Sequence, residues 1–184
     1  PLVPGRDDDL VENDGQITKG PMRALTLAAL APRPGEHVWD IGGGSGSVAI
    51  EWLLSHPSLS ATTIEPRHDR AARIRRNADQ LGVDRLNIVE GPAPEALHDL
   101  HSPDAVFVGG GLSADMLTWL HANLPVGTRL VANAVTLESE AMLASAQAER
   151  GGTLMRIELA QTEPLGRKRG WKSAYPVVQW SVTL

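Results

Sequence analysis

The feature that most limits the fold of this chain is a regular alternation of short apolar segments with longer helical patterns. The expected strands are residues 37–41, 61–64, 86–89, 105–108 and 129–132, and the expected helices are residues 21–30, 47–54, 67–81, 113–120 and 138–149. Strands that alternate with helices are typical of β-α-β crossovers, which place the strands parallel to one another. We therefore expect an α/β fold with a doubly wound sheet.

The end of the chain departs from this alternation. Two further β-rich segments, residues 154–159 and 177–182, have no helix between them and are joined by a basic loop that contains glycine. Such a connection suits an antiparallel pair at one edge of the sheet. The full expectation is a seven-stranded sheet that is mostly parallel and has an antiparallel edge strand.

The length of 184 residues fits one domain that can bury its own core. Residues 1–14 contain two prolines and the acidic run Asp7-Asp8-Asp9, so we expect a linker or flexible arm before a domain that spans residues 15–184. Because the chain begins with Pro1 rather than Met, we also expect a processed chain or a fragment of a longer protein.

Several classes of site are excluded by what the sequence lacks. It has no cysteine, which removes disulfides, zinc–thiolate sites, iron–sulfur clusters and thiol nucleophiles. His98 and His101 have a spacing that could hold a metal, but no third ligand supports them, so no metal site is expected. The net charge of −5 argues against a general nucleic-acid binder. There is no apolar run of membrane-spanning length and no signal-peptide pattern, so we expect a cytoplasmic enzyme.

The strongest indication of function is the run DIGGGSG from Asp40 to Gly46, between an expected strand and an expected helix. Glycines at such a turn let backbone N–H groups approach a ligand closely. A dinucleotide fingerprint would need a further glycine where Ser47 stands. The acidic-x-G-x-G-x-G pattern instead resembles the first motif of the Rossmann-like methyltransferases that use S-adenosylmethionine.

Two later segments support this interpretation. Glu65 ends the second expected strand, where a carboxylate can accept both hydroxyls of a ribose. Gly91-Pro92-Ala93 follows the third strand, where the methyltransferases that the pattern resembles pack adenine against small residues. Each motif alone is weak, because a glycine turn is often only a tight helix entry. Three motifs in order at strand ends favour a methyltransferase over a structural turn or a nicotinamide site.

The kind of methyl acceptor is narrowed by further absences. Methylation of a pyrimidine ring usually needs a Cys nucleophile, and the Asn/Asp-Pro-Pro-aromatic motif of base-amino methylation is also missing, since the fourth strand ends in Val108-Gly109-Gly110-Gly111. One basic cluster, Arg167-Lys168-Arg169-Gly170-Trp171-Lys172, lies between the last two strands. This cluster is either a solvated loop or a cap over a polyanionic, aromatic-like substrate.

Several segments together resemble the precorrin methyltransferases of the cobalamin pathway, in particular the decarboxylating carbon-15 family. These segments are Gly15 to Arg23, the glycine loop, Ile64-Glu65, Glu90 to Ala93 and Asp104 to Gly110, and the resemblance runs from Asn13 to the C-terminus. The resemblance implies methyl transfer from S-adenosylmethionine to carbon 15 of a precorrin, a tetrapyrrole, with decarboxylation of a ring acetate. It also implies a homotetramer, and either a stand-alone enzyme or, as the start of the chain favours, a C-terminal domain linked to an N-terminal methyltransferase domain.

The residues and the resemblance together give two sets of expected contacts. Cofactor contacts are expected at Thr18, Asp40, Gly42, Gly43, Gly44, Ser45, Gly46, Glu65 and Ala93. Substrate contacts are expected at Lys19, Arg23, Gly110, Gly111, Asn133, Arg167, Lys168, Arg169, Trp171 and Lys172. Asp40 can instead bond the N–H groups of its own turn, and Asn133 can serve a turn alone. No general acid or base is named, because an electron-rich ring carbon needs no covalent nucleophile and catalysis would be mostly positioning.

Two other functions stay open at this point. An RNA or tRNA methyltransferase of the same fold could use the basic loop to follow phosphates, although the chain has only one Phe and one Tyr for base stacking. A binding module that keeps the fold without catalysis is the third possibility. The expected partner is a tetrapyrrole, with no nucleic acid and no membrane.

Overall fold

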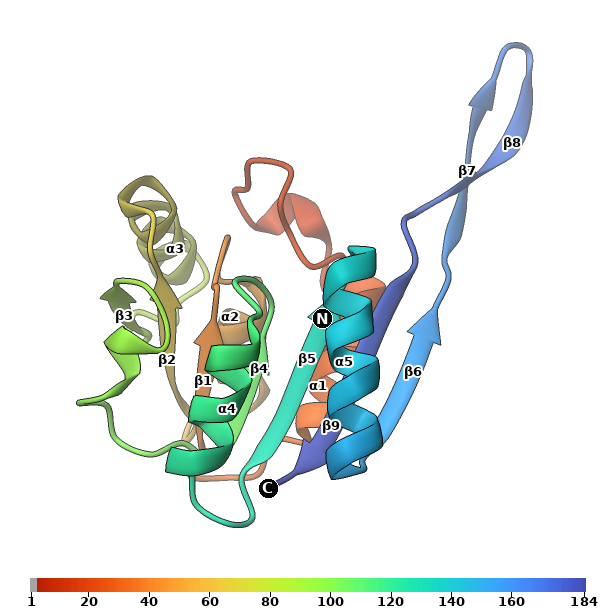
Figure 1. Cartoon of the computed structure of the whole chain (residues 1–184). Coiled ribbons are helices and arrows are strands. Elements are labelled where there is room, and N and C mark those ends of the chain that lie inside the picture. The colour runs from red at the N-terminus through yellow and green to blue at the C-terminus, as the bar shows by residue number, and fades with distance from the viewer. Residues whose placement is uncertain (1–2) are drawn as a thin grey trace.

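The computed structural model describes residues 3–184, and it contains a seven-stranded sheet with the order β3-β2-β1-β4-β5-β9-β6 (Figure 1). The parallel strands are β1 (His37–Ile41), β2 (Ser60–Glu65), β3 (Asn87–Glu90), β4 (Ala105–Val108) and β5 (Arg129–Ala134). The chain winds outward from β1 to β3 and then returns to start β4 on the other side of β1. This confirms the Rossmann-like, doubly wound α/β fold and puts the reversal of strand order between β1 and β4.

The reversed strand is β9 (Val177–Thr183), which pairs antiparallel with β5 and also with β6 (Thr153–Ile157). The expected antiparallel pair at one edge of the sheet is confirmed: β6 is the edge strand, and β9 lies one position inside it. The burial of the side chains explains the order. Val178, Gln179 and Trp180 of β9 are buried, whereas β6 is exposed along most of its length.

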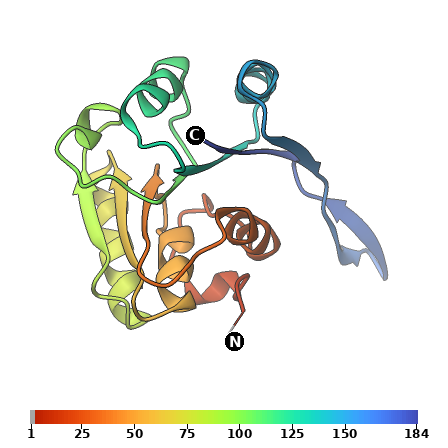
Figure 2. The ribbon, with the colours of Figure 1, turned by 90° about the horizontal axis from the view of Figure 1, so that it is seen from below.

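The helices cover both faces of the sheet (Figure 2). One face carries α1 (Gly20–Leu30), α2 (Ser47–Ser55) and α3 (His68–Gln80), and the other carries α4 (Ala114–Asn123) and α5 (Leu137–Arg150). Each face has its own core: Trp52 lies in the first and Trp39 in the second. Helix α3 shows why the polar sequence forms a helix here, since Ala71, Ile74 and Ala78 at helical spacing are buried on one face.

The connection that we expected to be a basic loop is a β-hairpin, formed by β7 (Ala160–Leu165) and β8 (Lys168–Ser173). It extends past the body of the domain in both views (Figures 1 and 2). All residues of both strands are exposed except Gly170, which is half-buried. The turn is made at Gly166, whose positive φ of 61° suits a tight connection. Both strands contain charged residues, so the sequence of the hairpin has no hydrophobic pattern from which its strands could be predicted.

The segment expected to be an exposed arm is described from residue 3 onward; residues 1 and 2 lie outside the described residues. It includes the short 3-10 helix η1 (Asp8–Leu10), and a second such helix, η2 (Glu95–Leu97), follows β3. Most side chains of the segment are exposed, but Val11 is buried and the backbone of Gly5 and Glu12 bonds to α2 and α3. The segment is therefore attached to the domain rather than free. No helix within residues 3–184 is both long and apolar enough to cross a membrane.

Candidate functional site

A cavity of about 1050 Å³ lies beyond the C-terminal ends of the parallel strands. Its volume is slightly above the 300–1,000 Å³ that is usual for a small-ligand pocket. Strand order reverses beside it, which is where open α/β sheets bind their ligands. The wall is built from residues 15–19, the turns after β1, β2, β3, β4 and β5, and the segment that leads from β8 into β9.

The turn after β1 packs so tightly that only glycine fits at two of its positions. A Cβ at Gly42, where φ is 74°, would lie 2.7 Å from backbone atoms of Gly110 after β4. A Cβ at Gly43 would lie 2.1 Å from the hydroxyl of Thr63. Because side chains are missing here, the turns after β1 and β4 can approach each other and present their backbone to the cavity.

Glu65, at the end of β2, is the best-defined polar group of the cavity. One carboxylate oxygen accepts the N–H of Gly44 at 2.9 Å, and the other accepts the N–H of Arg67 at 3.0 Å. The side chain is buried in the protein and lines the cavity. These two hydrogen bonds fix the carboxylate in place. Because each oxygen has further lone pairs, the carboxylate can still accept two hydroxyls of a ligand.

Asp40 is fully buried beneath the same turn. Its Oδ2 atom accepts the N–H of Ala49 in the first part of α2 at 3.2 Å. Burial, aided by the negative charge of Glu65, raises the pKa of Asp40 to about 7. The hydrogen bond supports the local interpretation of this residue, in which it holds the turn and the helix together, although Asp40 also belongs to the cavity wall.

All but one of the expected cofactor residues come together at this cavity. Thr18, Asp40, Gly42, Gly43, Gly44, Ser45, Glu65 and Ala93 line it. Gly46 is the exception, because it precedes α2 with a φ of 77° and a Cβ there would lie 2.7 Å from Ile74 of α3. Gly46 therefore allows helix packing and does not face the cavity.

The expected substrate residues divide into two groups. Lys19, Gly110, Gly111, Asn133 and Lys172 line the cavity. Asn133 is held by two hydrogen bonds, because its amide nitrogen donates to Thr26 at 3.1 Å and its oxygen accepts from Gln179 at 2.9 Å. Asn133 therefore has a fixed orientation where β5 approaches the cavity.

Arg23 does not lie in the cavity wall, which corrects the expectation that it contacts substrate. Its side chain is completely buried and pairs with Glu51 at 2.9 Å and with Asp8 at 2.6 Å. The guanidinium also donates to the backbone carbonyls of Arg6 and Thr18. The sequence alone predicts a substrate contact for Arg23, because it does not show that the carboxylates of Asp8 and Glu51 surround this side chain.

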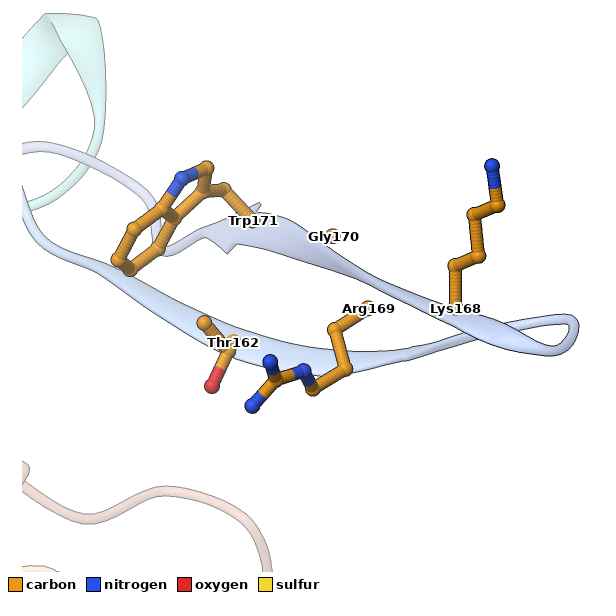
Figure 3. A pocket seen from close by; sticks show the side chains of 5 residues that line it. All are labelled: Thr162, Lys168, Arg169, Gly170 and Trp171. Carbon is orange, nitrogen blue, oxygen red and sulfur yellow. The ribbon is translucent and has the colours of Figure 1, made fainter.

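The basic cluster is also placed differently from the expectation. Arg167, Lys168, Arg169 and Trp171 lie on the projecting hairpin and do not line the main cavity. A separate hollow of about 490 Å³ lies along the hairpin itself, and Figure 3 shows its residues spread along the two strands with Lys168 near the tip. The tight turn keeps the strands paired and extended, so the cluster points away from the domain instead of folding over the site.

Sequence reasoning missed an apolar part of the cavity wall. Val135 and Tyr175 lie in this part, together with residues 157, 159 and 177. The side chain of Tyr175 is 83% exposed and that of Val135 is 58% exposed, although both are large hydrophobic groups. Their places directly after β5 and just before β9 are the only signal in the sequence that could have indicated them.

Comparison with known proteins decides the family. The domain family described as "Precorrin methyltransferase domain" matches residues 9–184. The chain belongs to this family. The resemblance found in the sequence is thereby confirmed, and it extends over the fold as well as the motifs.

Similar proteins of the precorrin methyltransferase family carry related names. Precorrin-6Y C(5,15)-methyltransferase [decarboxylating] from Sinorhizobium sp is 57% identical over 185 residues, which cover 100% of this chain and 45% of that protein. Cobalt-precorrin-6B C(15)-methyltransferase (decarboxylating) from Salmonella typhimurium is 31% identical, with coverage of 88% and 85%. The chain thus spans less than half the length of the first relative and most of the second.

Solved structures of other proteins have a similar fold. The C-terminal domain of precorrin-6Y C5,15-methyltransferase from Rhodobacter capsulatus superposes with a TM-score of 0.96 at 56% identity, and each chain is covered completely. A tRNA (m1A58) methyltransferase from Aquifex aeolicus has a TM-score of 0.69 at 14% identity, covers 93% of this chain and 72% of its own, and shows the fold alone.

Proposed function

We propose that this chain transfers a methyl group from S-adenosylmethionine to carbon 15 of a precorrin and decarboxylates a ring acetate, as a step of cobalamin biosynthesis. The observation that carries the proposal is a single cavity in which a fixed carboxylate on one side is continuous with an apolar wall flanked by lysines on the other. The proposal agrees with the names of the similar proteins.

The cofactor fits the half of the cavity formed by the turns after β1, β2 and β3. Glu65 would accept the ribose hydroxyls, because both of its oxygens are held by backbone N–H groups. The bare backbone of residues 42–45 would receive the amino-acid portion, and Ala93 would contact the adenine. Thr18 would close this half from the other side. When bound, the cofactor supplies an electrophilic methyl group.

The tetrapyrrole fits the other half of the cavity. Val135 and Tyr175 offer an apolar surface to a conjugated ring, and Lys19 and Lys172 also line the cavity. Lys19 pairs with Asp8 at 3.5 Å, and Lys172 pairs with Glu163 across the hairpin at 3.1 Å. Exposed ion pairs of this kind are weak. Carboxylates of the substrate could therefore replace the protein partners of both lysines at little cost.

Catalysis by this chain would consist mainly of positioning. Gly110 and Gly111 leave space between the two halves, so the acceptor carbon can approach the methyl group in line. The electron pair released with carbon dioxide can pass into the conjugated ring. The described residues that line the cavity include no histidine, and their only carboxylates are Asp40 and Glu65. We therefore assign no general acid or base.

A first test measures the affinity for S-adenosylhomocysteine by calorimetry in the wild type and in Glu65→Gln. We expect binding by the wild type and a loss of about tenfold to a hundredfold in the variant, because hydrogen bonds to a charged group contribute about 1.5–3 kcal/mol. Glu90→Gln is the matched control, since Glu90 also ends a strand but its side chain pairs with His68 outside the cavity. Equal affinities in all three proteins would contradict the assigned role of Glu65.

The assembly and location belong to the same proposal. We propose a homotetramer, because the projecting hairpin exposes Trp171 and Leu165 and a two-stranded ribbon has little stability in water unless something covers it. Light scattering of the purified chain would measure this state. We also propose that the chain is the C-terminal domain of a longer cytoplasmic protein with an N-terminal methyltransferase domain, which the 45% coverage of the Sinorhizobium relative supports.

The alternative of an RNA or tRNA methyltransferase has lost the feature that favoured it. That alternative relied on a basic loop beside the active site, but Arg167, Lys168 and Arg169 lie on the hairpin and not in the cavity wall. No other observation on the described residues supports nucleic-acid binding.

A further inference from the structure

Residues 5–14 bond through their backbone to buried polar side chains of α2 and α3. Figure 1 shows this early part of the chain in red, close to the upper ends of the central strands. The first such side chain is Glu51 of α2. It accepts the N–H groups of Gly5 and Arg6 at 2.6 and 3.0 Å, and it also accepts from the side chain of Arg23 at 2.9 Å. The start of the described chain is therefore fixed to the domain core.

Arg23 extends this link to the cavity. It is fully buried and donates to Asp8 and to the carbonyls of Arg6 and Thr18. A buried guanidinium that loses a partner is costly, so these groups hold one another in place. Thr18 belongs to the wall of the cofactor half. Through Arg23, the segment that precedes residue 15 is connected to that wall.

Asn77 of α3 makes a second and independent link. Its side chain is completely buried, and its oxygen accepts the N–H of Glu12 at 2.9 Å. The amide nitrogen donates to the carbonyl of Glu12 at 2.9 Å and to the carbonyl of Ser45 at 3.0 Å. Ser45 lies in the glycine turn that lines the cavity. The side-chain amide of Asn77 therefore connects the N-terminal segment to the glycine turn.

We infer that residues 5–14 are a positioning element of the cofactor site and that Asn77 and Arg23 are its positioning residues; the inference rests on the proposed binding of S-adenosylmethionine. The element holds the two walls that face each other across the cofactor half, the Thr18 segment and the glycine turn. Loss of either link loosens residues 5–19 on the domain, so that the glycine turn, the Thr18 segment or both can move, which weakens cofactor binding although no residue that touches the cofactor has changed.

The side chains of the same segment make contacts that serve as a comparison. Glu12 pairs with Arg76 at 2.7 Å, and both side chains are more than half exposed. Exposed ion pairs contribute little to stability. The inference therefore assigns the positioning effect to the backbone of Glu12, which bonds to Asn77, and not to the charge of its side chain.

The test uses Glu12→Pro, which removes the backbone N–H that donates to the oxygen of Asn77 and substitutes no buried residue. Arg76→Ala is the matched control, since it removes the exposed ion pair and keeps the backbone link. Calorimetry with S-adenosylhomocysteine is expected to show a dissociation constant about tenfold higher for Glu12→Pro, and a value within about twofold of the wild type for Arg76→Ala.

Two further variants separate positioning from loss of stability. Asn77→Ala removes the link from the other side, and Arg129→Met breaks a half-buried ion pair with Glu36 at the opposite end of the sheet. We expect both to lower the melting temperature but only Asn77→Ala to weaken binding. Equal weakening in Arg129→Met, or affinity in Glu12→Pro that matches Arg76→Ala, would overturn the inference.

A measurement without ligand keeps this inference distinct from the proposed function. Trypsin cleavage after Lys19, whose side chain is 61% exposed, reports how firmly the Thr18 segment is held. We expect cleavage about fivefold faster in Glu12→Pro than in Arg76→Ala, because a local opening of about 1 kcal/mol less has this effect. Equal rates would reject the positioning element, whereas a wild type that binds no S-adenosylhomocysteine would reject the proposed cofactor instead.

Discussion

At the scale of single residues, the site depends on polar groups that are buried and hold one another in place. Glu65 is fixed by two backbone N–H groups, and Asn133 by Thr26 and Gln179. Asp40 is different, because burial raises its pKa to about 7 and its charged form is unfavourable in the fold. The same residue that joins the glycine turn to α2 therefore makes the stability of the protein depend on pH.

The sign of this dependence follows from the two pKa values. The pKa of Asp40 is 3.8 in the unfolded chain and about 7 in the fold. The stability that Asp40 contributes to the fold is therefore fully present below pH 3.8 and is lost as the pH rises through 7. Asp40→Asn keeps an oxygen that can accept the N–H of Ala49 but cannot ionise. We expect the variant to gain in melting temperature over the wild type by more at pH 8 than at pH 5. The gain is about 2–4 °C for each 1 kcal/mol added to the free energy of unfolding. Identical pH profiles in thermal denaturation would contradict this explanation.

At the scale of elements, the projecting hairpin separates two kinds of basic residue that are adjacent in the sequence. Lys172 lines the cavity at the base of β8, whereas Arg169 lies further along the same strand, outside the cavity wall. This distinction could not be predicted, because a six-residue basic cluster with a central glycine has no hydrophobic pattern that fixes its register. Only the pairing of β7 with β8 shows which end of the cluster faces the site.

The hairpin therefore predicts opposite results for two neighbouring substitutions. Lys172→Ala should raise KM for the tetrapyrrole about threefold to tenfold with a smaller change in kcat, because one carboxylate of the substrate loses its cation. Arg169→Ala is the matched control and should leave both constants unchanged. Steady-state kinetics at low and high salt would measure this, and an effect of Arg169→Ala as large as that of Lys172→Ala would contradict the placement of the substrate.

Other elements show how far the sequence could predict the site. The strands and the three turn motifs could be predicted, because alternation and glycine spacing are local signals. Arg23 could not be placed, since its carboxylate partners Asp8 and Glu51 come from the N-terminal segment and α2. The attachment of residues 5–14 was missed for the same reason, because it uses backbone groups of the segment and the buried side chain of Asn77. Contacts of this kind do not depend on a repeated pattern.

At the scale of the whole molecule, the sheet supplies one cavity with two halves. The turns after β1, β2 and β3 form the half proposed for the cofactor, and the ends of β5 and β6 with the entry to β9 form the half proposed for the substrate. Residues 5–14 bond to the first half through Arg23 and Asn77.

The most direct measurement of the central claim is the mass of the product. The protein is incubated with S-adenosylmethionine that carries an isotopically labelled methyl group and with candidate precorrins, and the tetrapyrrole is then weighed by mass spectrometry. The account predicts a product that has gained the labelled methyl group and lost carbon dioxide, and Glu65→Gln should form it more slowly at limiting cofactor. Labelled methyl transferred to RNA, or a tetrapyrrole that returns with its mass unchanged although the cofactor binds, would contradict the account.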